Sequence, residues 1–531
     1  MEKIAHKKQL IFILIVMVLA FSLAWLSAGA VNKSFSPVSF FSNVSFDDST
    51  KKLDTRHYKT TVGMSKYRIE SRGRIEISND DKRIKSISPG GYLEITKKTF
   101  GNNRKIVVKS SGNGTLTYEF YIANQEKPFD PEGKEWLAEI LPEVLRETGL
   151  AADTRSVRIY KNQGVAGFGK EMDLISSDFI NAMYFKALVK SVEVKESDYA
   201  AIAELIGKKI GSDFEKAGVL KETAEIFLKN ESAVKEYFSA VESIGSDFEK
   251  AGTLKRIMKE QLSEEQETLL LNTSSGIDSD FEQAGVLKKY INETKPREEL
   301  IRLLLKVSDN ISSDFEKSGV LKTLIEKQGI GEEIRNDFFK ATAKISSDFE
   351  NAGVLKIYLK SEGLDEENIE SFMEAVATIS SDFERAEVLA EVINKQKLNN
   401  LLISAVCKSA GQMSSSFEAA RVLKKLAIRI EEYPRAWSSF FEATENISSN
   451  FEKAGVLETV VQNLNKNDKL ALEILQIIPS LNSDFEKANV MVKIAGKVNL
   501  DDPVIREEYI EAVKSINSDF EQSRVSKYLF D

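Results

Sequence analysis

The chain has 531 residues, a formal net charge of −9, two histidines and one cysteine. This composition excludes an intrachain disulfide framework and leaves almost nothing for a His-ligated zinc site or a Ser/His catalytic triad, so no cofactor is expected. Residues 1–130 contain 21 Lys plus Arg against 12 Asp plus Glu, a net +9, whereas residues 131–531 contain 52 against 70, a net −18.

The first 32 residues have the pattern of a membrane signal. Three lysines precede an uncharged stretch, and a helix over residues 10–31 would be about 33 Å long, enough to cross a hydrocarbon core of about 30 Å. Ala28-Gly29-Ala30 also fits a signal-peptide cleavage site, with cleavage after Ala30. Residues 1–32 are therefore predicted to be a transmembrane anchor or a signal peptide. The basic flank places the bulk of the chain outside the cytoplasm, in the periplasm or at the cell surface.

Residues 33–125 alternate between apolar and polar side chains, which predicts a small basic β-sheet domain. The predicted strands are Tyr67–Ser78, Tyr92–Lys97, Lys105–Lys109 and Thr115–Ile122. A basic domain beside a membrane would favour anionic headgroups or envelope polymers. Lysines that protect strand edges are the structural alternative.

Residues 126–175 are predicted to form a helical junction. Within it, Gly164–Lys170 (GVAGFGK) has the spacing of a phosphate-binding loop, but Glu171 stands where a Ser or Thr would hold magnesium. A carboxylate there would repel the phosphates. This stretch is therefore predicted to be a helical segment.

From residue 176 to residue 531 a Ser-x-x-Glu pattern recurs ten times, at steps of 33 to 35 residues. A period of this length is typical of a helical solenoid. The pairs are Ser212/Glu215, Ser246/Glu249, Ser279/Glu282, Ser313/Glu316, Ser347/Glu350, Ser381/Glu384, Ser415/Glu418, Ser449/Glu452, Ser483/Glu486 and Ser518/Glu521.

Residues 345–355 (ISSDFENAGVL) show the expected structure of one repeat. Ser347 is predicted to cap a helix by accepting a hydrogen bond from the N–H of Glu350, while the Glu350 carboxylate returns to the N–H of Ser347. Asp348 is expected to complement the helix dipole. Phe349 and its nine equivalents are predicted to be buried, where they would join neighbouring repeats.

The segments before the caps also have helical periodicity, so each repeat is predicted to be an αα-hairpin. Examples are Asp365–Ile379, Pro434–Ile447 and Asp502–Ile516. The predicted fold is therefore mainly α: an α-solenoid of about eleven 34-residue, HEAT-like hairpins, preceded by the small β-domain and the N-terminal membrane helix or signal peptide. The count includes a degenerate first unit, Ser177–Phe179, which lacks the capping glutamate.

Two further positions have structural interpretations. The glycine six residues after most caps, as at Gly353, is expected to face solvent, because Glu387 and Arg421 replace it in other repeats. Cys407 follows an apolar helical run and is expected to be a buried small hydrophobe.

Two motifs at the junction resemble a known group. Residues 86–94 (SISPGGYLE) and 128–149 (PFDPEGKEWLAEILPEVLRETG) are similar to an uncharacterised family of bacterial envelope proteins, in which SDFEKAGVL-type repeats follow. The resemblance covers roughly residues 65–531. It implies a bacterial, extracytoplasmic module, which some relatives attach to a membrane zinc peptidase of the β-lactam-sensor type. This chain lacks the His-Glu-x-x-His motif, so the resemblance transfers no catalytic residue.

The sequence favours a binding scaffold whose repeat surface meets a protein or an envelope polymer, with regulation of a membrane peptidase or sensor as one role. Two alternatives stay open: a carboxylate-dependent hydrolase of cell-wall glycans, and a structural spacer. The spacer would have no concentrated apolar or charged patch. The acidic repeats argue against nucleic acid as a partner. The sequence leaves the oligomeric state open.

Overall fold

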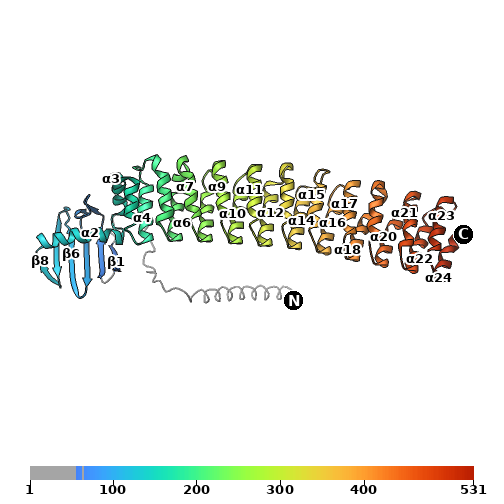
Figure 1. Cartoon of the computed structure of the whole chain (residues 1–531), viewed down its shortest axis with the longest axis horizontal. Coiled ribbons are helices and arrows are strands. Elements are labelled where there is room, and N and C mark those ends of the chain that lie inside the picture. The colour runs from blue at the N-terminus through green and yellow to red at the C-terminus, as the bar shows by residue number, and fades with distance from the viewer. Residues whose placement is uncertain (1–54, 63–64, 531) are drawn as a thin grey trace. The chain divides into compact units, whose positions relative to one another are not determined.

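The computed structural model describes residues 55–62 and 65–530. This part of the chain is mainly helical, about 65%, with 23 α-helices and a small N-terminal antiparallel β-domain (Figure 1). The predicted anchor or signal peptide, residues 1–32, lies outside the described residues. Among the residues that are described, no helix is both long and apolar enough to cross a membrane.

The β-domain contains one six-stranded antiparallel sheet, in the order β1-β2-β5-β6-β7-β8, and the two-stranded pair β3-β4. The strands are β1 (Thr55–Val62), β2 (Ser65–Arg72), β3 (Ile75–Ile77), β4 (Ile84–Ile87), β5 (Tyr92–Thr99), β6 (Asn102–Ser110), β7 (Leu116–Ile122) and β8 (Gln125–Lys127). The prediction of one strand over Tyr67–Ser78 is wrong. The chain turns at Gly73, whose φ of +84° is a conformation that favours glycine, and β3 then leaves the six-stranded sheet.

One face of this sheet packs against helix α2 (Lys134–Thr148). Alternate residues of the central strands, such as Ile69, Ile95 and Ile106, are buried together with Trp136 and Leu141 of the helix. The residues between these core positions include exposed charged side chains, as in β6. This alternation is expected for a sheet that has one face in contact with solvent.

The remaining helices form two series. The first series, here called the ladder helices, is α4 (Asp178–Val189), α6 (Asp213–Leu228), α8 (Asp247–Ile257), α10 (Asp280–Glu293), α12 (Asp314–Gln328), α14 (Asp348–Ser361), α16 (Asp382–Lys395), α18 (Ser416–Ala427), α20 (Asn450–Gln462), α22 (Asp484–Ala495) and α24 (Asp519–Ser526). The second series, the partner helices, is α3 (Ala152–Met172), α5 (Tyr199–Lys209), α7 (Glu231–Glu242), α9 (Glu264–Ser274), α11 (Glu298–Ser308), α13 (Arg335–Thr342), α15 (Ile369–Ala377), α17 (Asn400–Gly411), α19 (Trp437–Glu445), α21 (Asp468–Ile477) and α23 (Pro503–Lys514). Short helical turns are η2 (Phe129–Gly133), η3 (Glu196–Asp198), η4 (Glu332–Ile334), η5 (Ile430–Glu432), η6 (Pro434–Ala436), η7 (Ile478–Ser480) and η8 (Lys527–Leu529).

Each helix of a series contacts the next helix of the same series, so the two series form two layers of a helical array. Figure 1 shows the helices following one another in chain order along this array. One continuous apolar core joins the layers from Ala152 to Val525, and Cys407 lies fully buried within it. This arrangement is that of a helical-repeat protein, in which each unit contacts mainly its neighbours.

The partner helices are shorter than their predicted ranges. Residues 365–379, for example, contain helix only over α15, because Asp365 Oδ1 accepts a hydrogen bond from the N–H of Asn368 and forms a turn before the helix starts. Similarly, Pro434–Ala436 forms a separate short turn before α19. At their C-terminal ends the predicted ranges extended into the connection that leads to the next cap.

A buried arginine links the β-domain to the first helices of the array. Arg155 of α3 is only 2% exposed; its Nε donates to Asp81 Oδ2 at 2.9 Å, its Nη1 to Tyr184 Oη at 2.9 Å and its Nη2 to Glu171 Oε1 at 2.7 Å. Arg146 of α2 also donates to Glu171, at 2.6 Å. Burial alone would lower the pKa of Arg155, but the neighbouring Tyr184, Asp81 and Glu171 outweigh it and raise that pKa.

The stretch Gly164–Lys170 lies inside α3, which is interrupted at Gly164 by a non-helical φ of +64°. The Glu171 carboxylate that follows is 11% exposed and is bound by Arg146 and Arg155. Glu171 therefore belongs to a structural ion-pair cluster.

This cluster predicts acid sensitivity at the junction. Burial would raise the pKa of Glu171, but the hydrogen bonds and charges of Arg146 and Arg155 hold it below its ordinary value of 4.5. A carboxyl group whose pKa is lower in the folded state stabilises the fold above its unfolded pKa, and that contribution disappears as the pH falls through the folded pKa. Hydrogen exchange of peptides from residues 152–189 at a series of pH values, corrected for the intrinsic exchange rate, should show that this region is more stable in wild type than in Glu171→Gln at pH 7. The difference should shrink below pH 4.5; a constant difference would contradict this account.

Candidate functional site

The N-terminal ends of the ladder helices carry the repeated residues of the sequence pattern. At all ten predicted caps the serine Oγ accepts a hydrogen bond from the glutamate N–H three residues later, at 3.3 to 3.4 Å. The degenerate first unit does the same, because Ser177 Oγ accepts from the N–H of Ile180 at 3.4 Å. The caps therefore set where each ladder helix begins.

The aspartate that follows most caps has a role that the sequence did not predict. Asp280 at the start of α10 accepts hydrogen bonds from the backbone N–H groups of Ser312 and Ser313, at 2.9 and 2.8 Å, and these two residues precede α12. The same bond to the next cap is made by Asp178, Asp213, Asp247, Asp314, Asp348, Asp382 and Asp484. The aspartate thus joins one ladder helix to the next, in addition to any interaction with the helix dipole.

At most caps this bond replaces the expected return of the glutamate to its own cap, because the serine N–H is already donated to an aspartate. Eight of the ten glutamates, all except Glu215 and Glu486, pair instead with a cation. Lys255 of α8, for example, reaches Glu282 of α10 at 3.0 Å. Equivalent pairs are Lys221–Glu249, Lys288–Glu316, Lys322–Glu350, Lys356–Glu384 and Lys424–Glu452. Each of these pairs bridges two successive ladder helices.

Glu486, at the start of α22, departs from both the prediction and this pattern. Its backbone N–H donates to Ser483 Oγ at 3.3 Å as expected, but its carboxylate does not return to the N–H of Ser483 to complete a reciprocal cap. The prediction of a reciprocal bond is therefore wrong at Glu486, as it is for the glutamates of the other nine caps. The position on α20 that would supply the bridging lysine holds Glu458, which binds Lys493 at 2.6 Å. Two carboxylates repel each other, so Glu486 cannot pair with this residue as its equivalents pair with lysine.

A lysine after the glutamate makes a third recurring contact. Lys216 is 5% exposed, and its Nζ donates to the backbone oxygen of Ser243, which follows α7, at 3.1 Å. Lys250 and Lys487 donate in the same way to Gly276 and Ser515. A cation beside the last carbonyls of a helix is favourable, so this lysine stabilises the end of the partner helix that follows its own helix in the chain.

The aspartate bond leads to a test. Asp280→Ala should lower the free energy of opening of α12 by about 1–2 kcal/mol, because two N–H groups at its start lose their acceptor. Asp280→Asn should cost less, since Asn450 accepts a hydrogen bond from the Asn482 N–H in the equivalent place, at 2.8 Å. Native-state hydrogen exchange of α12 measures the effect. The control is Glu231→Ala, which removes a charge from the first turn of α7; if it costs α7 as much, the bond between helices contributes nothing.

The glycines six residues after the caps do not simply face solvent. A Cβ at Gly285 would lie 3.0 Å from Nζ of Lys255, and a Cβ at Gly319 would lie 2.8 Å from Nζ of Lys288. These are the lysines that cross to the next glutamate. The glycine therefore provides room for the lysine, which explains why the residue is small in most repeats without any requirement for positive φ.

The phenylalanine two residues after each cap is exposed, so the prediction that this column is buried is wrong. Ala284, Val286 and Leu287 of α10 fill the core instead, each fully buried. Side chains in a helix point toward its N-terminus, so a side chain in the first turn projects beyond the helix end, past the packed layer. We call these residues the phenylalanine row: Phe214, Phe248, Phe281, Phe315, Phe349, Phe383, Phe417, Phe451, Phe485 and Phe520, which are 55–75% exposed.

Two rings of the row are partly covered by an arginine. Arg421 stands at the glycine position of its unit, and its guanidinium lies 5.6 Å from the centre of the Phe383 ring. Arg524 lies over Phe485 in the same way, at 5.8 Å. These arginines also pair with the glutamate of their own caps, Glu418 and Glu521. They occur where the preceding unit has Ala390 or Val492 in place of the lysine that bridges elsewhere.

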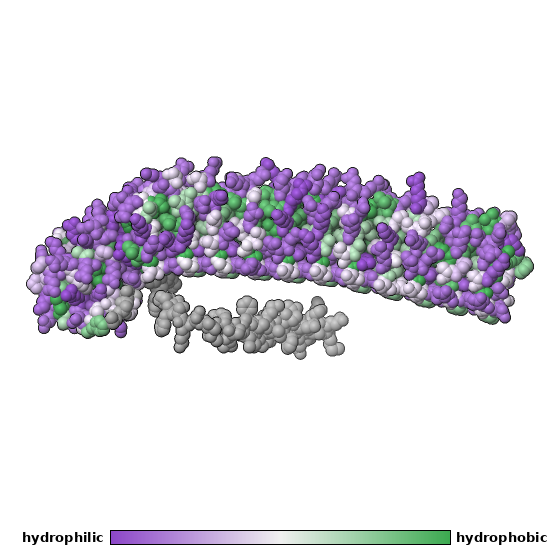
Figure 2. All heavy atoms as spheres, in the orientation of Figure 1, coloured by the Kyte–Doolittle hydropathy of each residue, from purple (hydrophilic) through white to green (hydrophobic). Residues whose placement is uncertain are grey.

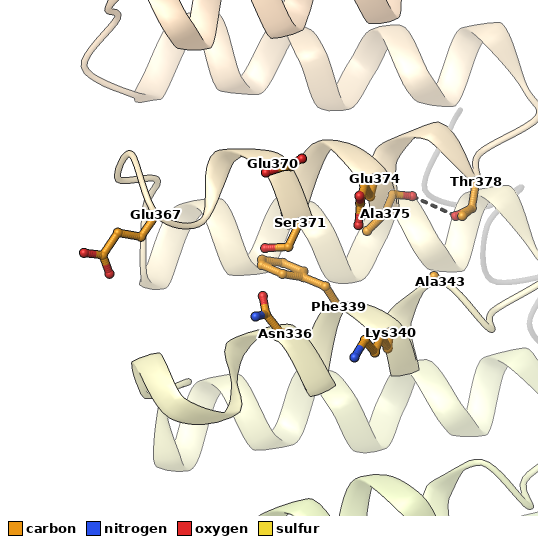
Figure 3. A pocket seen from close by; sticks show the side chains of 10 residues that line it. All are labelled: Asn336, Phe339, Lys340, Ala343, Glu367, Glu370, Ser371, Glu374, Ala375 and Thr378. Carbon is orange, nitrogen blue, oxygen red and sulfur yellow. Dashed lines mark hydrogen bonds between the residues drawn. The ribbon is translucent and has the colours of Figure 1, made fainter.

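A groove of about 490 Å³ lies between two partner helices. In Figure 3, Asn336, Phe339 and Lys340 of α13 form one side, and Glu370, Ser371 and Glu374 of α15 form the other. Glu367, in the turn before α15, completes the acidic edge. The three glutamates are exposed and lie along one helix and its preceding turn, opposite a lysine. Among the described residues, no cluster of His, Cys, Asp and Glu could hold a metal ion.

No family model matches the sequence, and no curated protein matches it. The solved structures that resemble it include a chain from "Computational Design of Self-Assembling Cyclic Protein Homooligomers". That chain is 14% identical, with 61% of this chain and 98% of the other covered, and the TM-score is 0.11. A TM-score this low supports no conclusion about fold or assembly.

Proposed function

We propose that this chain is an extracytoplasmic binding scaffold, exported or anchored in the membrane through residues 10–31. In this proposal its helices form an α-solenoid of about eleven HEAT-like hairpins that present a repeated surface to a protein or an envelope polymer. Regulation of a membrane peptidase or sensor is one role that such a scaffold would serve. The 34-residue period and the repeated bonds between successive ladder helices support the solenoid architecture.

The exposed phenylalanine row is the observation that carries the binding role. Figure 2 shows one face of the molecule, which is mostly hydrophilic with separate apolar patches. Against such a surface, ten phenylalanines at 55–75% exposure in a regular order are unusual, because soluble proteins rarely leave large apolar groups together in water. A spacer would need no such row. The row therefore favours binding over the spacer.

The groove between α13 and α15 does not favour the hydrolase alternative. Glycoside hydrolases place two carboxyl groups on opposite sides of the scissile bond. Here Glu367, Glu370 and Glu374 share one side, and Lys340 occupies the other. We therefore propose no catalytic residue.

The test is a crosslinking capture from membranes of the native host, with the full-length chain and with a version that ends after Leu150. The shorter version keeps the complete β-domain core, which ends with α2 and Leu150. A partner captured only by the full-length chain would place binding on the array. The same partner captured by both versions would assign recognition to the β-domain and make the helices a spacer.

A further inference from the structure

The phenylalanine row contains one uninterrupted stretch. Phe214, Phe248, Phe281, Phe315 and Phe349, here called the open run, are 67–70% exposed and lie at the starts of α6, α8, α10, α12 and α14. An aromatic side chain has roughly 150–250 Å² of surface, so the open run exposes roughly 500–900 Å². The summed area is comparable to that of the largest contiguous apolar patch of a typical monomer, roughly 300–600 Å², although the rings stand on separate helices.

The residues that precede the caps in this stretch are small or short, and some of them are held by the aspartate next to a ring. Asp213, next to Phe214, binds the N–H of Gly245, and Asp280, next to Phe281, binds the N–H of Ser312. The residue that precedes each of these caps is therefore held by the aspartate next to the phenylalanine of the preceding unit. In this stretch these residues are all exposed, and none is larger than aspartate: Gly245, Asp278, Ser312 and Ser346. No bulky side chain therefore stands at the position before the cap in the open run.

Glycine keeps the rings of the open run uncovered. The following units have Gly252, Gly285, Gly319 and Gly353 where Arg421 covers Phe383 elsewhere. In these glycine units the lysine of the preceding helix occupies the space over the glycine and is held by the next glutamate. The unit after Phe349 has Glu387 at this position, and Phe349 is still 67% exposed. All five rings are therefore exposed to a ligand.

The spacing of the rings selects one ligand conformation. The rings occupy the same position on successive ladder helices, and these helices are in contact. Because packed helices lie about 8–10 Å apart, we expect the rings to recur about every 8–10 Å. A polyproline II helix has three residues per turn and a rise of about 3.1 Å, so the same side recurs about every 9.3 Å. An extended β-strand presents the same side about every 6.6 Å and falls out of step after the first ring.

Hydrogen bonding also favours a polyproline II ligand over an extended β-strand. A strand needs a row of backbone partners, but at α12 the N–H groups of Ser312, Ser313 and Glu316 are already bound by aspartate and serine side chains. Phenylalanine offers no hydrogen bond. A polyproline II backbone stays solvated and needs none, and proline-rich segments bind aromatic surfaces at low conformational cost.

From these observations we infer that the open run binds a proline-rich, basic segment of a partner protein in the polyproline II conformation, with one proline on each ring. The basic character follows from charge, because residues 131–531 have a net charge of −18, and lysine or arginine between the prolines would be attracted. This inference rests on the proposed binding function and specifies the chemistry of its partner.

The test uses the full-length chain in mild detergent and a fluorescent peptide of five Pro-x-x triplets, with lysine and alanine between the prolines. The control peptide has the same composition with irregularly spaced prolines. Fluorescence anisotropy should show that the peptide with a proline at every third residue binds. The control peptide should bind at least about tenfold more weakly, a difference in binding free energy of about 1.4 kcal/mol. Equal binding of both peptides, or binding of neither, would overturn the inference.

Two variants locate the site. Phe281→Ser, in the middle of the open run, should weaken binding about tenfold, whereas Phe520→Ser, an equally exposed ring on α24, should not change it. The double variant Lys255→Ala/Gly285→Arg copies the natural pair Ala390/Arg421 and should cover Phe248 without removing it. It should also weaken binding. An unchanged affinity in Phe281→Ser, or an equal loss in Phe520→Ser, would refute the assignment.

Other occupants have distinct outcomes. Self-association that Phe281→Ser abolishes would identify a second copy of the chain, and binding to lipid vesicles that the same variant abolishes would identify a membrane surface; either result would replace the peptide. Failure of the peptide together with capture of a protein through the array would refute this inference and leave the proposed function standing. Absence of any capture through the array would refute the proposed function itself.

Discussion

Arg155→Met is expected to lower the free energy of opening of α3 and α4 by about 3 kcal/mol, because breaking a buried ion pair strands the remaining charges. The guanidinium is 2% exposed and bound to Asp81, Glu171 and Tyr184. The expected loss is at the low end of the usual range. Asp81 keeps Arg158, and Glu171 keeps Arg146, so neither carboxylate is left alone.

Hydrogen exchange of peptides from residues 152–189, analysed by mass spectrometry, would measure this effect locally. A local measurement is needed because a long array does not unfold in one step. Arg146→Met is the matched control: its side chain is 30% exposed and binds only the outer side of the cluster, so about 1 kcal/mol is expected. Equal losses in the two variants would show that burial of Arg155 adds nothing to the junction.

Leu287→Ala is expected to lower the free energy of opening of α10 by about 2–5 kcal/mol, whereas Phe281→Ser on the same helix should change it by less than about 0.5 kcal/mol. Leu287 is 0% exposed within the core, and its truncation leaves a cavity between layers. Phe281 is 70% exposed, so its removal leaves no cavity. The smaller side chain therefore has the larger effect.

Exchange protection of α10 in the two variants, each compared with wild type, measures this contrast. Exchange in the distant helix α22 provides an internal reference, since each unit contacts mainly its neighbours. A large loss in Phe281→Ser would mean that the row contributes to packing after all. Phe281→Ser could then not be used to locate the peptide site, because it would also destabilise the fold. The double variant Lys255→Ala/Gly285→Arg would be used in its place.

The N-terminal ends of the ladder helices could be predicted because capping is local. A serine oxygen meets an N–H three residues away within the same turn, so the sequence contains both partners. Burial of Phe349 could not be predicted in this way. Hydrophobicity and helical spacing favoured the core, but whether a first-turn side chain meets a neighbour depends on how far the next helix extends, which one repeat does not contain.

The partners of Asp348 and Glu350 were missed for a related reason. Asp348 binds the N–H groups of Ser380 and Ser381, and Glu350 binds Lys322, so all of these contacts join different units. A signal was available in comparing units: Arg421 and Arg524 occur where the preceding unit lacks its lysine. That coupled change indicates that the two positions share one glutamate.

In the β-domain, the predicted strands correspond to the buried central strands, while β1, β4 and β8 were missed. β8 has only three residues, all polar, and lies at the edge of the sheet. β4 has four residues and pairs only with β3. Short or polar edge strands are formed by pairing with a neighbour, and an isolated segment of sequence gives little indication of them.

The aspartate that binds the next cap gives the array a polarity and a uniform joint. Because Asp213, Asp280 and Asp348 make the same bond to the following unit, each joint accepts any unit that starts with the same cap. Loss or gain of one whole unit among those that share the aspartate, the glycine and the bridging lysine would leave the remaining joints chemically unchanged. Copy number could therefore vary between related genes by unequal recombination, which would alter the reach of the molecule without requiring a new interface.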